Sequence, residues 1–308
     1  MHNDEWAARP AVPPRSVFGN YPPPVAPGTA PLAREPISRN DADGEPGQIF
    51  VEPLQRGIDV AMARSFLYRF LGQMYQDPTV EGWAQVTASA CREIFESAVR
   101  AAVAGMPPLA QAAAALLAQL RLELFESFLT AYLAAFGHAA RGRCPLNEIE
   151  YGDIKADPLF QPHRLADIAA FYRAFGLEAA DDADERHDHI CLELEFMCVL
   201  AAKEAYALEH QLERELLLLC RDAQKRFLRE HLGRWTPAFA RRLARMADDN
   251  PLGAVANFTR IFIEAECERF GLMPGSEDLL LRPVDEAAES LCHSCGGNGL
   301  SPEAPVQP

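Results

Sequence analysis

The densest group of side chains that could do chemistry is E-R-H-D-H at residues 185–189. An apolar segment follows directly, and the apolar residues of positions 190–201 recur at intervals of three and four, the period of an α-helix. The polar group is therefore expected at a helix N-terminus, where free backbone N–H groups and the helix dipole favour hydrogen-bond acceptors and negative charge. Two interpretations follow: Asp188 is the N-cap of this helix, or the group binds a ligand.

A second group is C-H-S-C at residues 292–295, followed by two glycines. Two cysteines at this spacing resemble half of a zinc or iron–sulfur site. A closed zinc site takes about four ligands, so Cys292 and Cys295 would need Cys144, Cys267 or a second chain to complete it. This interpretation implies a metal-binding assembly factor, and its alternative is a flexible thiol pair without a structural role. The rest of the sequence requires no cofactor.

Motifs of common enzymes are absent from the sequence. It contains no G-x-x-x-x-G-K-[ST] loop, no H-E-x-x-H and no G-x-S-x-G, and no G-x-G-x-x-G follows a strand. Glu193 with Glu195, and Glu264 with Glu266, are paired carboxylates on predicted helices, but a spacing of two puts the members of each pair on different helix faces. We therefore expect a protein that is not an enzyme.

The sequence is acidic, with a formal net charge of −15. Such a surface repels nucleic-acid phosphates, so we expect no nucleic-acid partner, but it would attract a basic peptide. No apolar run reaches the roughly 18 residues that cross a bilayer, and the first residues lack the basic and apolar regions of an export signal. We therefore expect a cytoplasmic protein without stable membrane insertion.

Helices must position these groups, because helical spacing of apolar residues fills the middle of the chain and β-branched runs of period two are essentially absent. We expect an all-α, single-domain helical bundle at residues 54–274, after a disordered proline-rich extension at 1–53 and before a mobile tail at 275–308. The predicted helices span residues 58–75, 81–104, 109–136, 162–175, 188–231, 236–248 and 252–270. A connection of about twenty residues precedes the fourth helix, and connections this long are often functional.

Four segments in a fixed order resemble a known family. They are A-R-S-F-L-Y-R-F-L-G-Q-M-Y-Q-D-P at 63–78, C-P-L-N-E-I-E-Y-G at 144–152, L-A-D-I-A-A-F-Y-R-A-F-G-L at 165–177 with the following E-R-H-D-H-I, and F-L-R-E-H-L-G-R-W-T-P-A-F at 227–239. Together they resemble the TorD/DmsD/NarJ family of cytoplasmic chaperones for molybdenum oxidoreductases. Each segment alone is weakly specific, but the ordered set covers residues 57–272.

This resemblance implies an all-helical chaperone without catalytic activity, acting as a monomer or a homodimer. Such a chaperone binds the twin-arginine signal peptide and the catalytic subunit of a molybdopterin oxidoreductase, holds them until the cofactor is inserted, and so delays export. The client-binding residues that the resemblance implies are Asp188, His189, Glu185, Glu148, Tyr151, Tyr132, Phe136 and Pro145. The family has proline where this chain has His187, a departure that leaves the client's identity open.

The chemistry of a twin-arginine leader fits these residue types. Its arginines need carboxylates, because Arg–carboxylate contacts can be bidentate and charge-assisted, and its apolar segment needs an apolar groove. The acid could come from Glu148, Glu150, Asp153, Asp184, Glu185 and Asp188. The apolar surface could come from Tyr132, Phe136, Tyr151 and Phe160. The alternatives are a solvated acidic loop and, for Phe128, Tyr132 and Phe136, a place in the core, which their spacing of four favours.

Overall fold

The structure is a computed structural model and describes residues 48–102, 106–137, 142–152, 160–178, 186–247 and 249–282. Within these ranges the chain forms helices and two 3-10 turns, with two isolated antiparallel bridges and no strand. The elements are α1 (Gln48–Met74), α2 (Val80–Thr87), α3 (Ser89–Ala102), α4 (Pro107–Gln119), η1 (Leu122–Leu124), α5 (Phe125–Phe136), η2 (Glu148–Glu150), α6 (Phe160–Ala174), α7 (Ile190–Glu209), α8 (Arg214–Glu230), α9 (Leu232–Met246) and α10 (Pro251–Arg269). The predicted all-α class is confirmed.

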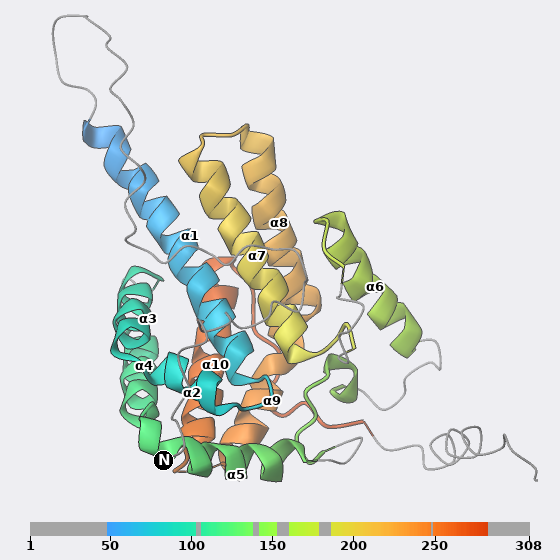
Figure 1. Cartoon of the computed structure of the whole chain (residues 1–308). Helices are drawn as coiled ribbons and strands as arrows, with labels where there is room; N and C mark the ends of the chain where they lie inside the picture. The colour runs from blue at the N-terminus through green and yellow to red at the C-terminus, as the bar shows by residue number, and fades with distance from the viewer. Residues whose placement is uncertain are drawn as a thin grey trace, which may run out of the picture.

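Helix α7 lies at the centre of the bundle, between α1 and α8 (Figure 1). Its side chains are buried from Ile190 to Ala201 except at Glu195, as expected for a helix that is surrounded by other elements. Helix α10 packs against α9 and α4, and α3 packs against α1. The first turn of α7, which the polar group precedes, is therefore fixed by a packed core.

Three of the predicted helices are each broken into two. The helix predicted at 81–104 is α2 and α3, interrupted at Ala88, whose backbone is extended with ψ 142°. The helix predicted at 109–136 is α4 and α5 with η1 between them, and the one predicted at 188–231 is α7 and α8, joined by a turn with Gln211 at φ 49°. No glycine or proline marks any of these breaks, so the sequence did not indicate them.

Distant side chains stabilise one of these breaks. The guanidinium of Arg92 on α3 donates from Nη1 to the carbonyls of Leu117 and Leu120, at 2.8 and 2.6 Å. The indole of Trp83 donates to the carbonyl of Arg121 at 3.1 Å. The open carbonyls at the end of α4 thus receive tertiary donors, which replace the next turn of helix.

Both ends of the domain extend beyond the expected limits. Helix α1 begins at Gln48, ten residues before the predicted start, and contains Pro53. At the other end, residues 275–282 were expected in the tail but pair with other segments: the amide of Gly275 donates to the carbonyl of Gly233, and that of Gly152 to the carbonyl of Leu280, at 2.9 and 3.0 Å. Position 275 requires glycine, because a Cβ there would lie 1.8 Å from the carbonyl oxygen of Arg234.

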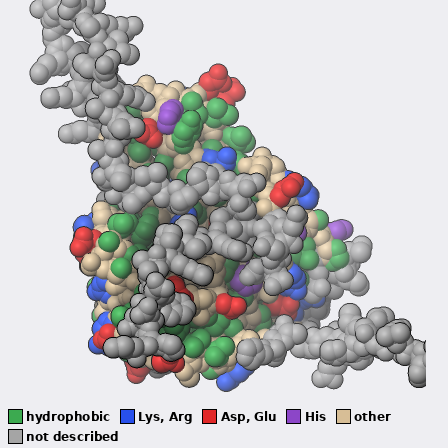
Figure 2. All heavy atoms as spheres, in the orientation of Figure 1, with side chains coloured by type: hydrophobic (Ala, Val, Ile, Leu, Met, Phe, Trp, Pro, Cys, Tyr) green, Lys and Arg blue, Asp and Glu red, His purple; other side chains and the backbone are tan. Residues whose placement is uncertain are grey.

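Large apolar side chains are exposed where α7 meets α8. Tyr206 and Leu219 are each 56% exposed, and Leu216 is 46% exposed. Figure 2 shows hydrophobic side chains gathered over this end of the hairpin. Clustered exposed apolar side chains are typical of interaction surfaces.

Candidate functional site

The turn before α7 lies against the linker that contains η2 (residues 142–152). Asn147 and His189 form an antiparallel bridge. Beside it, the amide of Glu148 donates to the carbonyl of Asp188 at 2.9 Å. The two segments that the sequence predicted to form one site are therefore adjacent.

Asp188 is not the N-cap of α7, contrary to one of the two interpretations of the sequence. His189 takes that position, and its ring nitrogen Nδ1 accepts from the amide of Cys191 at 3.3 Å. The Asp188 carboxylate turns to the linker, where it accepts from the amide of Ile149 at 3.1 Å and from the side-chain amide of Asn147 at 3.2 Å. The linker supplies these donors from a distant part of the chain, so the carboxylate caps the linker instead of the helix.

Arg186 covers the Asp188 carboxylate on its outer side. Its Nε and Nη2 atoms donate to the two carboxylate oxygens at 3.0 and 3.1 Å, and Nη2 lies 3.6 Å from Oε1 of Glu150. Asp188 is consequently fully buried, whereas the Arg186 side chain is 45% exposed. His187 is exposed, and its carbonyl accepts from the hydroxyl of Tyr172 at 2.8 Å.

Burial lowers the pKa of His189 to about 4. The positive charge of Arg186 lowers it further, whereas the negative charge of Asp188 raises it. The ring is therefore neutral near pH 7, in keeping with the hydrogen bond that Nδ1 accepts. In this structure His189 orders the start of α7. The charge of Asp77 also acts on this ring.

Glu148, itself fully buried, is the centre of a second group. Its Oε1 accepts from Arg164 on α6, with 2.8 Å to Nε, and lies 3.2 Å from Nη2 of Arg234 on α9. Its Oε2 lies 2.9 Å from Nδ1 of His231, whose Nε2 lies 3.3 Å from the Asp167 carboxylate. Glu148 thus joins η2, α6 and the junction of α8 with α9.

Two buried carboxyl groups of this region, Glu148 and Glu193, have opposite pKa shifts. Burial alone would raise the pKa of Glu148, but the hydrogen bond and charge of His231 and the charges of Arg164 and Arg234 lower it. Burial and the charge of Glu148 raise the pKa of Glu193 well above its usual range, despite the hydrogen bond that it accepts from the Trp235 indole at 3.0 Å. Glu148 is therefore the ionised member and Glu193 the neutral one.

The apolar residues predicted to contact a client lie inside the protein. Tyr151 and Pro145 are buried, and the hydroxyl of Tyr151 donates to the carbonyl of Pro145 at 2.8 Å. Tyr132 and Phe136 are 6% and 9% exposed and stack edge to face, with 4.6 Å between their ring centroids. With Phe128, which is 2% exposed, they belong to the core, as their helical spacing favoured.

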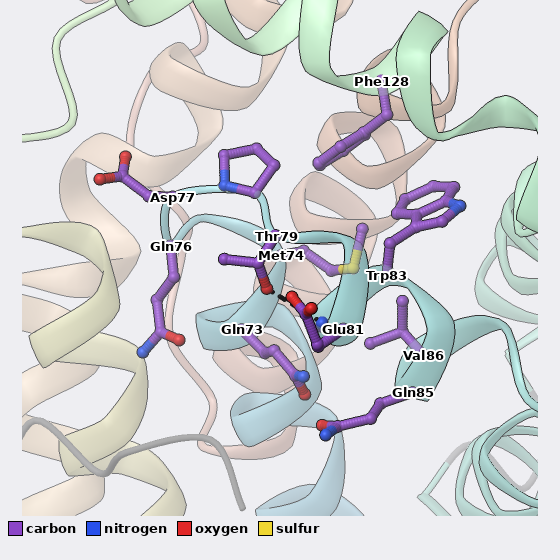
Figure 3. A pocket seen from close by; sticks show the side chains of 12 residues that line it. Gln73, Met74, Gln76, Asp77, Thr79, Glu81, Trp83, Gln85, Val86 and Phe128 are labelled. Carbon is purple, nitrogen blue, oxygen red and sulfur yellow. Dashed lines mark hydrogen bonds between the residues drawn. The ribbon is translucent and has the colours of Figure 1, made fainter. Parts of the chain in front are cut away.

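An open pocket of about 190 Å³ lies between the end of α1, α2 and α5, and the sequence reading missed it (Figure 3). It has an apolar floor and a rim of amides and carboxylates, made by Gln73, Met74, Gln76, Asp77, Pro78, Thr79, Glu81, Gly82, Trp83, Gln85, Val86 and Phe128. Figure 3 shows the Trp83 and Phe128 side chains on one side and the Asp77 carboxylate on the other. The hydroxyl of Tyr132 lies 3.5 Å from Asp77, so the pocket adjoins the predicted site.

Comparison with known proteins identifies the family. The profile of the family described as nitrate reductase delta subunit matches residues 102–241. The perchlorate reductase assembly chaperone protein of Dechloromonas aromatica (strain RCB) is 28% identical over 221 residues, which are 70% of this chain and 94% of the relative. The selenate reductase assembly chaperone protein of Thauera selenatis is 31% identical over 146 residues, 47% of this chain and 72% of the relative. The chain belongs to the TorD/DmsD/NarJ family.

Another relative is the chaperone protein TorD of Vibrio cholerae serotype O1 (strain M66-2), 28% identical over 119 residues, which are 38% of this chain and 52% of the relative. Members of the TorD/DmsD/NarJ family are chaperones and not catalysts, so this chain is a chaperone and not an enzyme. No helix in the described ranges is long and apolar enough to cross a membrane.

Several predicted residues of this TorD/DmsD/NarJ chaperone lie outside the described residues. They are Glu185, Asp153, Asp184, Cys292 and Cys295. Their predicted roles, including a zinc or iron–sulfur site at the C-x-x-C, stay predictions.

The two cysteines proposed to complete that metal site are poor ligands. Cys144 and Cys267 are buried, and burial raises the pKa of each thiol to about 12. Zinc binds thiolates, and both thiols stay protonated near neutral pH, so neither cysteine is poised to bind the metal. In the described part of the chain no three His, Cys, Asp or Glu side chains are placed to hold a metal ion. Metal analysis with and without Cys292 and Cys295 tests the remaining pair.

Proposed function

We propose that this chaperone assists the assembly of a molybdopterin oxidoreductase by binding its twin-arginine leader and its catalytic subunit until the cofactor is inserted. Two relatives are named as assembly chaperones of perchlorate and selenate reductases, which supports a client of this kind. The leader is exposed before export, so the chaperone acts in the cytoplasm.

The observation that carries the proposal is the pocket between α1, α2 and α5. Its floor is lined by the buried side chains of Trp83 and Phe128, which are 4% and 2% exposed, and its rim offers the exposed carboxylates of Asp77 and Glu81. Among the described residues no lysine or arginine forms an ion pair with Asp77 or Glu81. A leader peptide with arginines beside an apolar segment matches an apolar floor whose rim carboxylates have no cation from the described part of the chain.

The buried carboxylates are less suitable as the first contact. Glu148 is surrounded by the chain's own cations, and Asp188 is covered by Arg186. Taking a leader arginine to either would require breaking an existing charged hydrogen bond, whereas Asp77 gives up at most the 3.5 Å contact with the Tyr132 hydroxyl.

Removing the two rim carboxylates tests the proposal. We expect Asp77→Asn with Glu81→Gln to weaken leader binding about tenfold, because charge-assisted hydrogen bonds to arginine are lost. The measurement is calorimetric titration with synthetic twin-arginine leaders of molybdenum oxidoreductases from the same genome. The matched control is Asp59→Asn with Glu209→Gln, which removes the same charge from exposed positions in the first half of α1 and at the end of α7. Equal affinity of the rim and control variants would contradict the proposal, as would the absence of binding by the unmodified chain.

A further inference from the structure

We propose that Arg186 occupies, within the chaperone itself, the place of one leader arginine. It fills a receptor for a guanidinium group formed by Asp188 and Glu150, and it leaves this receptor when the leader binds. This inference rests on the proposed function and adds to it a second subsite with a built-in competitor.

The receptor has the geometry that an arginine requires. Two nitrogens of Arg186 contact the two oxygens of Asp188 at 3.0 and 3.1 Å, which is a bidentate fork. The Glu150 carboxylate approaches the same guanidinium to 3.6 Å from η2. Two carboxylates from different segments thus converge on one guanidinium, and a lysine ammonium cannot reproduce the fork.

The receptor does not depend on Arg186 for its position. The Asp188 carboxylate also accepts from the amide of Ile149 and the side chain of Asn147, at 3.1 and 3.2 Å. The turn is further held by the bond from the Glu148 amide to the Asp188 carbonyl, at 2.9 Å. Removing the guanidinium therefore leaves a preorganised carboxylate that is open to solvent.

Arg186 is suited to leave. It precedes the helix in a turn, and its side chain is 45% exposed. Among the described residues, the ion pairs of this side chain are those with Asp188 and Glu150. The buried Asp188 carboxylate needs a cation, but Arg186 is half-exposed and regains water when it leaves. Exchange of one guanidinium for another keeps the fork and restores solvation to Arg186, so it costs little.

Two functional consequences follow from this exchange. The leader binds this chaperone less tightly than it would bind a receptor without Arg186. The reason is that only those molecules whose Arg186 side chain has left the receptor can accept a leader arginine. The exchange also discriminates, since an arginine restores the two hydrogen bonds to Asp188 that Arg186 gives up and a lysine does not.

The test compares Arg186→Ala with Arg173→Ala. Arg173 is exposed on α6, so its removal gives the same change of net charge without touching the receptor. We expect Arg186→Ala to bind a twin-arginine leader about fivefold tighter than the control, because its receptor is never occupied by Arg186. With a twin-lysine leader the two variants should bind equally. Arg186→Lys keeps the charge but loses the fork, and should bind the twin-arginine leader more tightly than the unmodified chain.

A second measurement does not need the leader. Low millimolar guanidinium should raise the Tm of Arg186→Ala relative to the same concentration of sodium, and should leave the unmodified chain and Arg173→Ala unchanged. If the unmodified chain binds the leader but Arg186→Ala binds no tighter than Arg173→Ala, the stand-in role is wrong and the proposed function stands. If no variant binds a leader, the proposed function fails, and the guanidinium measurement alone decides whether the receptor exists.

Discussion

Replacing Arg64 by methionine is expected to lower the free energy of unfolding by about 3–5 kcal/mol, the cost of removing one partner from a buried ion-pair group. Arg64 on α1 is 2% exposed. Its Nε donates to both oxygens of Glu266 on α10, at 2.9 and 2.8 Å, and its Nη1 donates to Glu204 on α7 at 3.0 Å. Its Nη2 donates to Gln224 on α8 at 2.6 Å. Methionine would leave two buried carboxylates without this cation, at the place where four helices meet.

The pKa values of this group agree with that expectation. Burial would lower the pKa of Arg64, but the charge and hydrogen bond of Glu266 raise it above its usual range. Burial would raise the pKa of Glu204, but the charge of Arg64 and the hydrogen bonds from Gln224 and Arg221 lower it. Both groups are thus ionised partly because of each other, and loss of Arg64 leaves Glu204 with Arg221 and Glu266 with Arg269 as their remaining cations.

Urea unfolding at neutral pH measures the effect of Arg64→Met, with Arg69→Met as the control. Arg69 lies on the same helix, half-buried, and its replacement removes the same charge. Combining Arg64→Met with Glu204→Gln and Glu266→Gln should recover much of the loss, because no charge then remains buried unpaired. A loss no larger than that of Arg69→Met would mean that the group does not stabilise the bundle.

The sequence predicted the helical class because its apolar period is strong, and it missed breaks that depend on distant donors. The spacing of Leu116, Leu120 and Leu124 continues through the end of α4. What ends that helix is Arg92, which donates to its last carbonyls from α3. A contact of this kind leaves no signal in the local sequence. The spacing of apolar residues therefore predicts one continuous helix where the structure has α4 and α5.

The sequence also predicted that two distant segments lie together, but not the state of their side chains. It indicated that the linker with Glu148 and the turn with Asp188 act together, and the two are adjacent. Counting carboxylates could not show that the negative charge of Glu148 is already compensated by Arg164, Arg234 and His231, because those partners come from other parts of the chain. Ionisable residues far apart in sequence form such groups only through the fold.

The pocket was missed for a related reason. Its floor combines Met74 from α1 and Trp83 from α2 with Phe128 from α5, which follows only after α3, α4 and η1. A local signal did exist in the rim, where Gln73, Gln76 and Asp77 follow an apolar helix closely. Polar side chains at the end of a buried helix mark the place where it reaches the surface.

Replacing Glu148 by glutamine is expected to destabilise the protein by about 3 kcal/mol at pH 7, since it leaves three cationic or polar partners around a neutral amide. The folded-state pKa of Glu148 is lowered, because the opposing effects of His231, Arg164 and Arg234 outweigh burial. A carboxyl group with a lowered pKa contributes stability that is present above its unfolded value, about 4.3. That contribution is lost as the pH falls through the folded value.

The difference in stability between the unmodified chain and Glu148→Gln should therefore be largest near neutral pH and shrink as the solution is acidified below the ordinary glutamate pKa. Urea unfolding at a series of pH values measures it. Asp167→Asn is the control, because Asp167 faces the same His231 ring at 3.3 Å but is 49% exposed, and exposed pairs contribute about 0–1 kcal/mol. A glutamine variant as stable as this control at pH 7, or a difference that does not change with pH, would show that Glu148 does not fix the linker through its charge. The proposed guanidinium receptor at Asp188 borders this linker, so a true effect should also weaken leader binding in proportion to the loss of order at Asp188.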